Sequence, residues 1–278
     1  MADVGRRTLL AGLVALGLTP CSGAAAAARR PAGRPAASRP DDGPRPPASL
    51  LGTEIRRLPT TAKVIALTFN AAWDESGIDT VLAELRRRKV PATFFPTGEF
   101  AEAHPAALRT IAAEHGLGNH SHSHPYFDDL DTGERAEEVR RADAAIRTAS
   151  GAEPLPFFRF PYSATSEDSI ADVNELGYAV IEFTTDTNGY LGPDGGVTAD
   201  DAVRRAVDAF APGAIIQMHV GSDGDGVVTD AEALPRIIDA ARSAGYEITD
   251  LRRFLTTEGT GTAARRPAGA AKRPRVRP

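Results

Sequence analysis

Three histidines, His120, His122 and His124, lie within five residues of one another in the stretch NHSHSHP. In an extended strand all three side chains would face one side, whereas on a helical turn His120 and His124 would be neighbours and His122 would point away. Either geometry brings two imidazoles to one divalent metal, and zinc is the usual ion for nitrogen and oxygen ligands. The alternative is a group of hydrogen-bonded loop histidines without a metal. We expect a metal site.

Other residues suited to chemistry also follow short apolar runs. They are Asn70, Trp73 and Asp74 after VIALTF, Arg159, Pro161 and Tyr162 around PFFRF, Asp186 after YAVIEF, and His219 at the end of AIIQMH. With His120, His122 and His124, this set contains four of the six histidines. The other two, His104 and His115, fall on predicted helix surfaces, and we interpret both as structural. Trp73 is a candidate wall of a binding site, with core packing as the alternative.

Apolar, β-branched runs alternate with amphipathic segments through the body of the chain. The runs predict strands at 64–69, 92–96, 116–120, 156–160, 178–183, 214–219 and 246–249. Helical spacing of apolar residues predicts a helix over 77–88, and Asp131 with Glu134 resembles a capping box for a helix that reaches about Ser150. Ser166 and Thr198 are predicted N-caps of two further helices, and 230–244 is a helix before the last strand.

Seven strands that alternate with helices indicate an α/β fold with a mostly parallel sheet and right-handed crossovers. Because seven is close to the strand number of a barrel, we predict a closed or nearly closed β/α barrel rather than an open doubly wound sheet. In such a barrel the functional groups lie at the carboxyl ends of the strands. This is where the polar residues gather, from Asn70 after the first strand to His219 after the sixth.

The charge of the chain is divided unevenly. Residues 51–258 contain 19 basic and 34 acidic residues, a net charge of −15, whereas the last twenty residues contain six basic residues and no acidic one. An acidic body argues against nucleic acid as the substrate. The basic tail, 258–278, favours an anionic surface such as an acidic wall polymer, and its alternative interpretation is a solvated, disordered end.

The first residues resemble an export signal. Arg6 and Arg7 precede an apolar run that ends at Leu18, and small residues follow. The run is too short to favour a permanent membrane span, and the paired arginines also fit a twin-arginine signal. We therefore predict a signal peptide over 1–28 and a secreted or cell-wall-associated protein. A lipid anchor on Cys21, the only cysteine, is the alternative. The Pro-rich segment 29–51 is predicted to be an extended linker before a domain at 52–257.

Three short motifs occur in order at the predicted strand ends. His120-Ser-His-Ser-His124 matches the pattern His-Ser/Thr-x-x-His, Arg159-Phe-Pro-Tyr162 matches Arg-x-Pro-Tyr, and His219 ends an aliphatic-x-His pattern that is only approximate in its aliphatic position. Together they resemble the NodB-homology polysaccharide deacetylases, carbohydrate esterase family 4, from about Lys63 to Leu255. The resemblance implies a deformed β/α barrel, in agreement with the strand count.

The resemblance also implies the chemistry. Members of this family use a divalent metal to remove N-acetyl, or sometimes O-acetyl, groups from polysaccharides of cell-wall or chitin-like type. The metal polarises the poor amide electrophile and lowers the pKa of a bound water, and a general acid must protonate the leaving amine. By this resemblance His120 and His124 hold the metal, which is zinc or alternatively Co²⁺ or Ni²⁺, and His219 is the general acid.

The remaining roles also come from the resemblance. The backbone N–H of Tyr162 adds to the site of the tetrahedral oxyanion. Arg159 orients the catalytic carboxylate, and an ion pair with some other acid is its alternative role. Trp73, Pro161 and Tyr162 are the candidate substrate contacts.

Two motifs depart from the family pattern. The first is Thr-Phe-Asp-Asp in the family, where the two acids are the base and a metal ligand, but here Asn70 and Ala71 stand in their places. An amide cannot take a proton at neutral pH, and alanine cannot bind a metal. The fourth motif, Asp-x-x-Asp-Trp, keeps Asp186 but ends in Gly189 and Tyr190. The second acid of this motif, which the resemblance would place at residue 189 to support His219, is therefore missing.

Two hypotheses follow. In the first, which we favour, the chain is an active deacetylase whose base has moved to Asp74, or else to Asp186. Asp74 has a structural interpretation too, as an acid that the dipole of the following helix favours. In the second, the domain keeps the groove and the metal but only binds glycan. A zinc peptidase is disfavoured because the chain has no His-Glu-x-x-His motif.

Overall fold

The computed structural model describes residues 43–222, 224 and 226–255. The strands are β1 (Glu54–Ile55), β2 (Val64–Ala71), β3 (Thr93–Pro96), β4 (Gly116–Leu117), β5 (Phe157–Phe158), β6 (Ala179–Ile181), β7 (Thr185–Asp186), β8 (Ala214–His219) and β9 (Glu247–Thr249). The α-helices are α1 (Ile78–Arg88), α2 (Gly98–Ala103), α3 (Pro105–Glu114), α4 (Thr132–Ser150), α5 (Glu167–Glu175), α6 (Ala199–Asp208) and α7 (Thr229–Ser243). Short 3-10 turns are η1 (Ala48–Leu50), η2 (Phe127–Asp129), η3 (Pro161–Ser163), η4 (Gly189–Leu191) and η5 (Leu251–Leu255).

The strand β2 organises the larger sheet, whose order is β4-β3-β2-β8-β7. Along one edge of β2 the first half pairs with β9 and the second half with β3, while β8 pairs with the other edge. The smaller sheet has the order β1-β6-β5, and all ladders of both sheets are parallel. Two isolated bridges in the described residues connect the sheets: the parallel bridge from Asn119 to Phe158, between β4 and β5, and the antiparallel bridge from Arg57, just after β1, to Ala214 of β8. The predicted α/β fold with parallel strands is confirmed, as a barrel that is only loosely closed.

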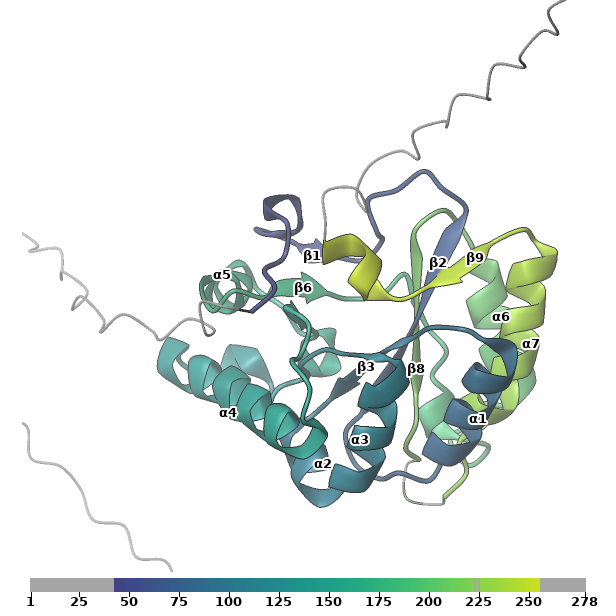
Figure 1. Cartoon of the computed structure of the whole chain (residues 1–278), viewed down its shortest axis with the longest axis horizontal. Coiled ribbons are helices and arrows are strands. Elements are labelled where there is room, and N and C mark those ends of the chain that lie inside the picture. The colour runs from purple at the N-terminus through teal and green to yellow at the C-terminus, as the bar shows by residue number, and fades with distance from the viewer. Residues whose placement is uncertain (1–42, 223, 225, 256–278) are drawn as a thin grey trace, which may run out of the picture. The chain divides into compact units, whose positions relative to one another are not determined.

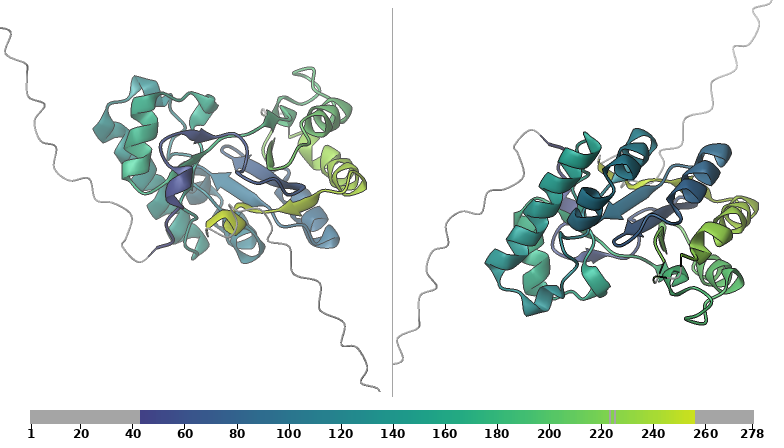
Figure 2. Two further views of the ribbon diagram at one scale, coloured as in Figure 1. Left: turned by 90° about the horizontal axis from the view of Figure 1, so that it is seen from above. Right: turned by 90° about the horizontal axis from the view of Figure 1, so that it is seen from below.

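Helices flank the strands on opposite sides. In Figure 1, α6 and α7 lie together to the right of β2 and β8, while α4 and α5 lie at the left. The views from above and below in Figure 2 keep the strands between these groups. A parallel strand covered on both faces shows no alternation of apolar and polar residues, and every residue of β2 is accordingly buried.

Alternation along β2 nevertheless sorts its side chains into two sets. Ile65, Leu67, Phe69 and Ala71 pack in the apolar cluster that includes residues of α1, α3 and α7. Val64 and Ala66 belong to a second cluster, which includes residues of β5 and β6. Because side chains alternate along a strand, Thr68 and Asn70 continue this second face toward the carboxyl end. The polar end of β2 therefore points into the space between the two sheets.

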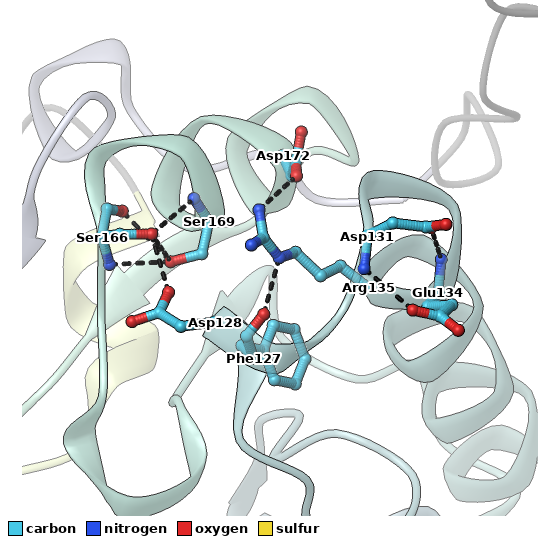
Figure 3. Close-up of polar contacts among 8 residues, drawn as sticks. All are labelled: Phe127, Asp128, Asp131, Glu134, Arg135, Ser166, Ser169 and Asp172. Atoms are coloured by element: carbon cyan, nitrogen blue, oxygen red, sulfur yellow. Dashed lines mark hydrogen bonds and ion pairs between the residues drawn. The ribbon is translucent and has the colours of Figure 1, made fainter. Parts of the chain in front are cut away.

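Hydrogen bonds at helix starts fix the loops that lead into the functional region (Figure 3). Asp131 and Glu134 form the predicted capping box of α4, and Ser166 caps α5. Arg135 of α4 donates to the carbonyl of Phe127 and pairs with Asp172 of α5 at 3.0 Å. The Ser166 hydroxyl donates to Asp128 at 2.8 Å. These contacts join the loop after His124 to the loop after Tyr162.

All seven predicted strands are present, and so are the helices predicted over 77–88, from Asp131, after Ser166 and Thr198, and at 230–244. The two-residue strands β1 and β7 were not predicted. The surface position predicted for His115 is wrong, because its ring is buried against Phe94 at a centroid distance of 5.4 Å. Packing begins before residue 52, since the side chain of Leu50 is buried in the second apolar cluster.

Several predictions concern residues outside the described ranges. The signal over 1–28, Cys21 and the basic tail from 258 lie there entirely, and so does most of the linker. Within the described part, no helix has both the length and the apolar character needed to cross a bilayer.

Candidate active site

A cavity of about 290 Å³ opens at the carboxyl ends of the strands. It is lined by Asn70, Ala72, Trp73, His120, His124, Phe160, Tyr162, Ser163, Phe183, Asp186, Tyr190, Gln217 and His219. Most of the residues that the sequence singled out therefore meet in one place. Asp74, Arg159 and Pro161 are not among the lining residues. Pro161 is buried at the start of η3.

His120 and His124 face each other in the cavity. Their ring centroids lie 4.8 Å apart with the rings edge to face. The loop achieves this with left-handed backbone at Ser121 and His124, and it turns His122 away toward Glu102, whose carboxylate is 3.2 Å from the His122 Nε2. Of the two geometries considered from the sequence, the loop adopts the one in which His120 and His124 are neighbours.

The environment of these two rings suits metal binding. His120 Nδ1 donates a hydrogen bond to the Arg159 carbonyl at 2.8 Å, so its Nε2 keeps the lone pair. The buried Nδ1 of His124 has no hydrogen-bond partner. Burial lowers the pKa of His120 well below its usual range and that of His124 to about 4, so both rings are neutral at pH 7. Among the described residues no group of three or more His, Cys, Asp or Glu side chains is placed to hold a metal.

Arg159 is fully buried and fixes the end of β2. Its Nη1 donates to Asn70 Oδ1 and its Nη2 to Thr68 Oγ1, both at 3.0 Å. The guanidinium also lies 4.2 Å from the ring centroid of Phe95, and its Nε donates to the carbonyl of Ile181. Burial lowers the pKa of Arg159 to about 10, which leaves it charged at neutral pH. Because arginine only donates, the Asn70 oxygen must face it and the amide NH₂ is the end left for the cavity.

Sequence reasoning missed Glu182, which follows β6 and is fully buried. Its carboxylate accepts hydrogen bonds from the Phe160 N–H at 3.1 Å and from the Ser163 hydroxyl at 2.6 Å. Burial raises the pKa of Glu182, although the nearby Arg159 charge opposes this. Glu182 thus holds the turn that carries Tyr162. The signal available in the sequence was a single acid inside the apolar run YAVIEF.

His219, at the end of β8, lies between two acids. Its Nδ1 is 3.8 Å from Asp186 Oδ1 and 3.7 Å from Asp230 Oδ2, and the Tyr190 ring lies 4.6 Å from its ring. Asp186 is itself held by Gln217 Nε2 at 2.7 Å and by the Asn188 N–H at 2.8 Å. Sequence reasoning missed Asp230, which it treated only as the first residue of a helix.

Asp74 lies in a different setting. Its carboxylate accepts hydrogen bonds from the Ser76 N–H at 2.8 Å and from the N–H and hydroxyl of Ser222. Burial alone would raise the pKa of Asp74, but these hydrogen bonds outweigh it and lower the pKa. The geometry favours the structural interpretation of Asp74 over a base.

Three exposed aromatic side chains lie on the side of the cavity where His124 is located. Trp73 is 57% exposed and its ring lies 5.1 Å from that of His124. Trp73 is therefore not a core residue, which was its alternative role. On another side of His124 lies Tyr162, which stacks on Tyr126 at 4.0 Å. Flat, exposed rings of this kind suit the apolar faces of sugars. Tyr126 was not predicted from the sequence.

The sequence is similar to those of known polysaccharide deacetylases. The sequence profile described as polysaccharide deacetylase matches residues 57–181. A chitooligosaccharide deacetylase of Sinorhizobium fredii is 31% identical over 206 residues, which cover 71% of this chain and 94% of that protein. A peptidoglycan-N-acetylglucosamine deacetylase of Bacillus cereus is 28% identical over 194 residues, or 69% of this chain and 68% of that protein.

Among solved structures, a CE4 family pseudoenzyme from Bacillus anthracis superposes with a TM-score of 0.66. The match covers 74% of this chain and 69% of that one, at 24% identity. At this identity the likeness shows a shared fold.

Proposed function

This chain belongs to the NodB-homology polysaccharide deacetylase family, carbohydrate esterase family 4, and from that we propose that it hydrolyses N-acetyl groups on a cell-wall or chitin-like glycan with the help of a divalent metal. One observation carries the proposal. A single cavity holds two neutral imidazoles 4.8 Å apart together with a third histidine that two carboxylates approach. A site that only bound glycan would have no evident need for the third.

The metal is part of this proposal. His120 and His124 would hold it, with zinc as our choice and Co²⁺ or Ni²⁺ as alternatives, because both rings are neutral and each offers a nitrogen lone pair. When bound, such an ion would polarise the amide carbonyl and lower the pKa of a coordinated water.

The proton transfers fall to His219. Asn70 has no basic site, so a neutral His219 takes the proton of the attacking water and then gives it to the leaving nitrogen. The carbonyl carbon gains a C–O bond and loses its C–N bond, which yields acetate and an amine. Asp186 stabilises the imidazolium that forms between these two steps. No described residue accepts a hydrogen bond from the backbone N–H of Tyr162. This N–H would therefore donate to the tetrahedral oxyanion.

Acetate release tests the proposal directly. We expect the protein to release acetate from N-acetylglucosamine oligomers or peptidoglycan when Zn²⁺, Co²⁺ or Ni²⁺ is added. The double variant His120→Ala/His124→Ala should lose bound metal in elemental analysis and lose acetate release as well. His104→Gln, which changes a histidine outside the cavity, is the matched control and should keep both. Acetate release that survives loss of the metal would contradict the proposal.

A second function has its own observation. Arg159 binds the Asn70 oxygen, so no carboxylate stands at the end of β2, and a glycan-binding protein without catalysis fits that feature. This second function predicts that the protein without substitutions retains N-acetylated glycan in a pull-down and releases no acetate with Zn²⁺, Co²⁺ or Ni²⁺. Asn70→Asp combined with Ala71→Asp should then create activity.

Export is proposed from the sequence alone. The arginines and the apolar run before Leu18 support secretion or attachment to the cell wall, with Cys21 as the site of an alternative lipid anchor. Fractionation of cells that express the full chain, with and without Arg6 and Arg7 changed to Lys, tests the route.

A further inference from the structure

Asp230 is a fully buried acid for which the fold alone gives no reason. It lies in the first turn of α7, where most acids are exposed to water. Its Oδ2 accepts a hydrogen bond from the backbone N–H of His219 at 2.8 Å, and its Oδ1 has no partner. A buried carboxylate with one oxygen unsatisfied is costly, so it calls for an explanation.

The explanation lies at the ring of His219. Its Nδ1 is buried and has no hydrogen-bond partner, yet two carboxylates approach it, at 3.7 Å from Asp230 and 3.8 Å from Asp186. Both separations are ion-pair distances and are longer than a hydrogen bond. A modest rotation of the ring would shorten either one, and catalytic hydrogen bonds often tighten only when substrate binds.

Gly189 shows that this arrangement is specific. A Cβ at residue 189 would overlap the Asp230 carboxyl group, since even the farthest of its three atoms would be only 2.5 Å away. The backbone of Gly189 is not left-handed, so the Asp230 carboxyl group, and not the φ angle, excludes a side chain. Residue 189 is the position where the family's fourth motif has its second acid. The Asp230 carboxylate fills the space that this acid's side chain would enter.

We infer that Asp230 is a positioning residue for His219, and that it supplies from α7 the negative charge that position 189 no longer provides. The inference rests on the proposed function, in which His219 carries a proton. With Asp230 behind Nδ1, the neutral ring keeps its proton on Nδ1 and turns a basic Nε2 toward the substrate. The same charge stabilises the ring once Nε2 has gained a proton. Other groups that face His219 are Asp186 from β7, Tyr190 from η4, and His120 and His124 across the cavity.

Asp230→Asn tests the inference because it keeps the shape and the backbone hydrogen bond but removes the charge. We expect kcat to fall about tenfold with KM within about twofold, and the limb of the kcat/KM profile that depends on His219 to move about one pH unit lower. Glu232→Gln removes an exposed charge from the same turn of α7 and should leave both unchanged. A profile that does not move in Asp230→Asn overturns the inference, even if stability falls.

Two further measurements do not depend on that variant's activity or folding. Long-range ¹H–¹⁵N NMR of the protein without metal should show the Nδ1–H tautomer of His219, with its signals assigned by their loss in His219→Asn. In Asp230→Asn the Nε2–H tautomer should gain population. If the tautomer shifts in a protein that never releases acetate, the proposed function fails and the role of Asp230 stands. An unchanged tautomer in an active protein would remove that role.

Moving the acid from residue 230 to residue 189 completes the test. Gly189→Asp alone should lose most activity, because its side chain collides with Asp230. Gly189→Asp combined with Asp230→Ala should recover at least tenfold over Gly189→Asp alone, together with the original pH profile. Failure to recover, in a variant that melts at the temperature of the original protein, contradicts the exchange of acids between 189 and 230.

Discussion

At the scale of single residues, we expect Asn70 to limit kcat/KM for acetate release. Its amide oxygen is fixed by Arg159, so the substitution Asn70→Asp would place one carboxylate oxygen against the same guanidinium. That contact keeps a carboxylate ionised and able to accept a proton. Asn70→Asp should therefore raise kcat/KM for acetate release at pH 7 by at least about tenfold, toward the lower end of what general-base catalysis supplies.

The control for this substitution is Asn70→Ala, which removes the amide without adding a base. It should lower kcat/KM, since Arg159 then keeps a donor without its partner. Equal rates for the Asp and Ala variants would show that residue 70 takes no part in proton transfer.

His115 gives a separate prediction about stability. Its ring is 5% exposed, neither nitrogen has a hydrogen-bond partner, and burial lowers its pKa. The unfolded chain therefore binds a proton more readily than the folded protein once the pH falls below about 6.5, and the free energy of unfolding decreases with falling pH. His115→Leu should remove up to about 1 kcal/mol of this loss between pH 7.5 and pH 5.5.

Urea unfolding at several pH values measures this effect. His104→Leu is the comparison, because His104 is partly exposed and its Nδ1 lies 3.2 Å from the Glu75 carboxylate. Its removal should not reduce the loss of stability at low pH. Parallel curves for the original protein and His115→Leu would contradict the prediction.

At the scale of elements, two loops together build an aromatic platform. Tyr126 precedes η2 and Tyr162 lies in η3, and the two rings stack. The residues that follow Tyr126 are held by the hydrogen bond from Ser166 to Asp128 and by that from Arg135 to the Phe127 carbonyl (Figure 3). Tyr162 adopts a left-handed φ of 59°, which a side chain accepts only when its surroundings impose it. The surroundings here are Glu182, which accepts hydrogen bonds from Phe160 and Ser163, and the ring of Tyr126.

Because a glycan chain extends past the sugar that reacts, this platform should matter for oligomers rather than for single sugars. Tyr126→Ala should raise KM for an N-acetylglucosamine oligomer about fivefold, the loss of about 1 kcal/mol of stacking, with kcat within about twofold. Asp128→Ala should have a smaller effect in the same direction, and the neighbouring Asp129→Ala should have none. An equal rise in KM for a single N-acetylated sugar would contradict a role beyond the reacting sugar.

The sequence predicted the helices and strands better than it predicted which residues pack against one another across the fold. Hydrophobic periodicity and capping residues located the long strands and the helices α1, α4, α5, α6 and α7, because those signals are local. For α2 and α3 no bounds were predicted, and only His104 and His115 were placed on helices. The strands β1 and β7 have two residues each and, unlike β4 and β5, do not lie in one of the apolar runs that predicted the strands. Glu182 and Asp230 were missed for a different reason. Whether an acid in a strand or a first helical turn is buried depends on what packs over it, and that is decided by segments far away in the chain.

At the scale of the whole molecule, the separation of charge predicts two different binding behaviours. The body has a net charge of −15 and should be repelled by anionic polymers, whereas the last twenty residues carry six positive charges. The cavity itself is lined mainly by aromatic, histidine and amide side chains, so a neutral N-acetylated oligomer needs no help from the tail. Anionic wall polymer, in contrast, should be held by the tail and pushed away by the body.

Replacing the six basic residues after 258 by Gln should separate these behaviours. Binding to an anionic wall polymer at 50 mM salt should fall about tenfold, and the difference should vanish near 500 mM salt, where charges are screened within a few ångströms. Acetate release from neutral oligomers should stay within about twofold at both salt concentrations. If that rate fell together with polymer binding, the tail would act on the catalytic domain itself. The separation of a neutral catalytic cavity from a basic anchoring segment would then be wrong.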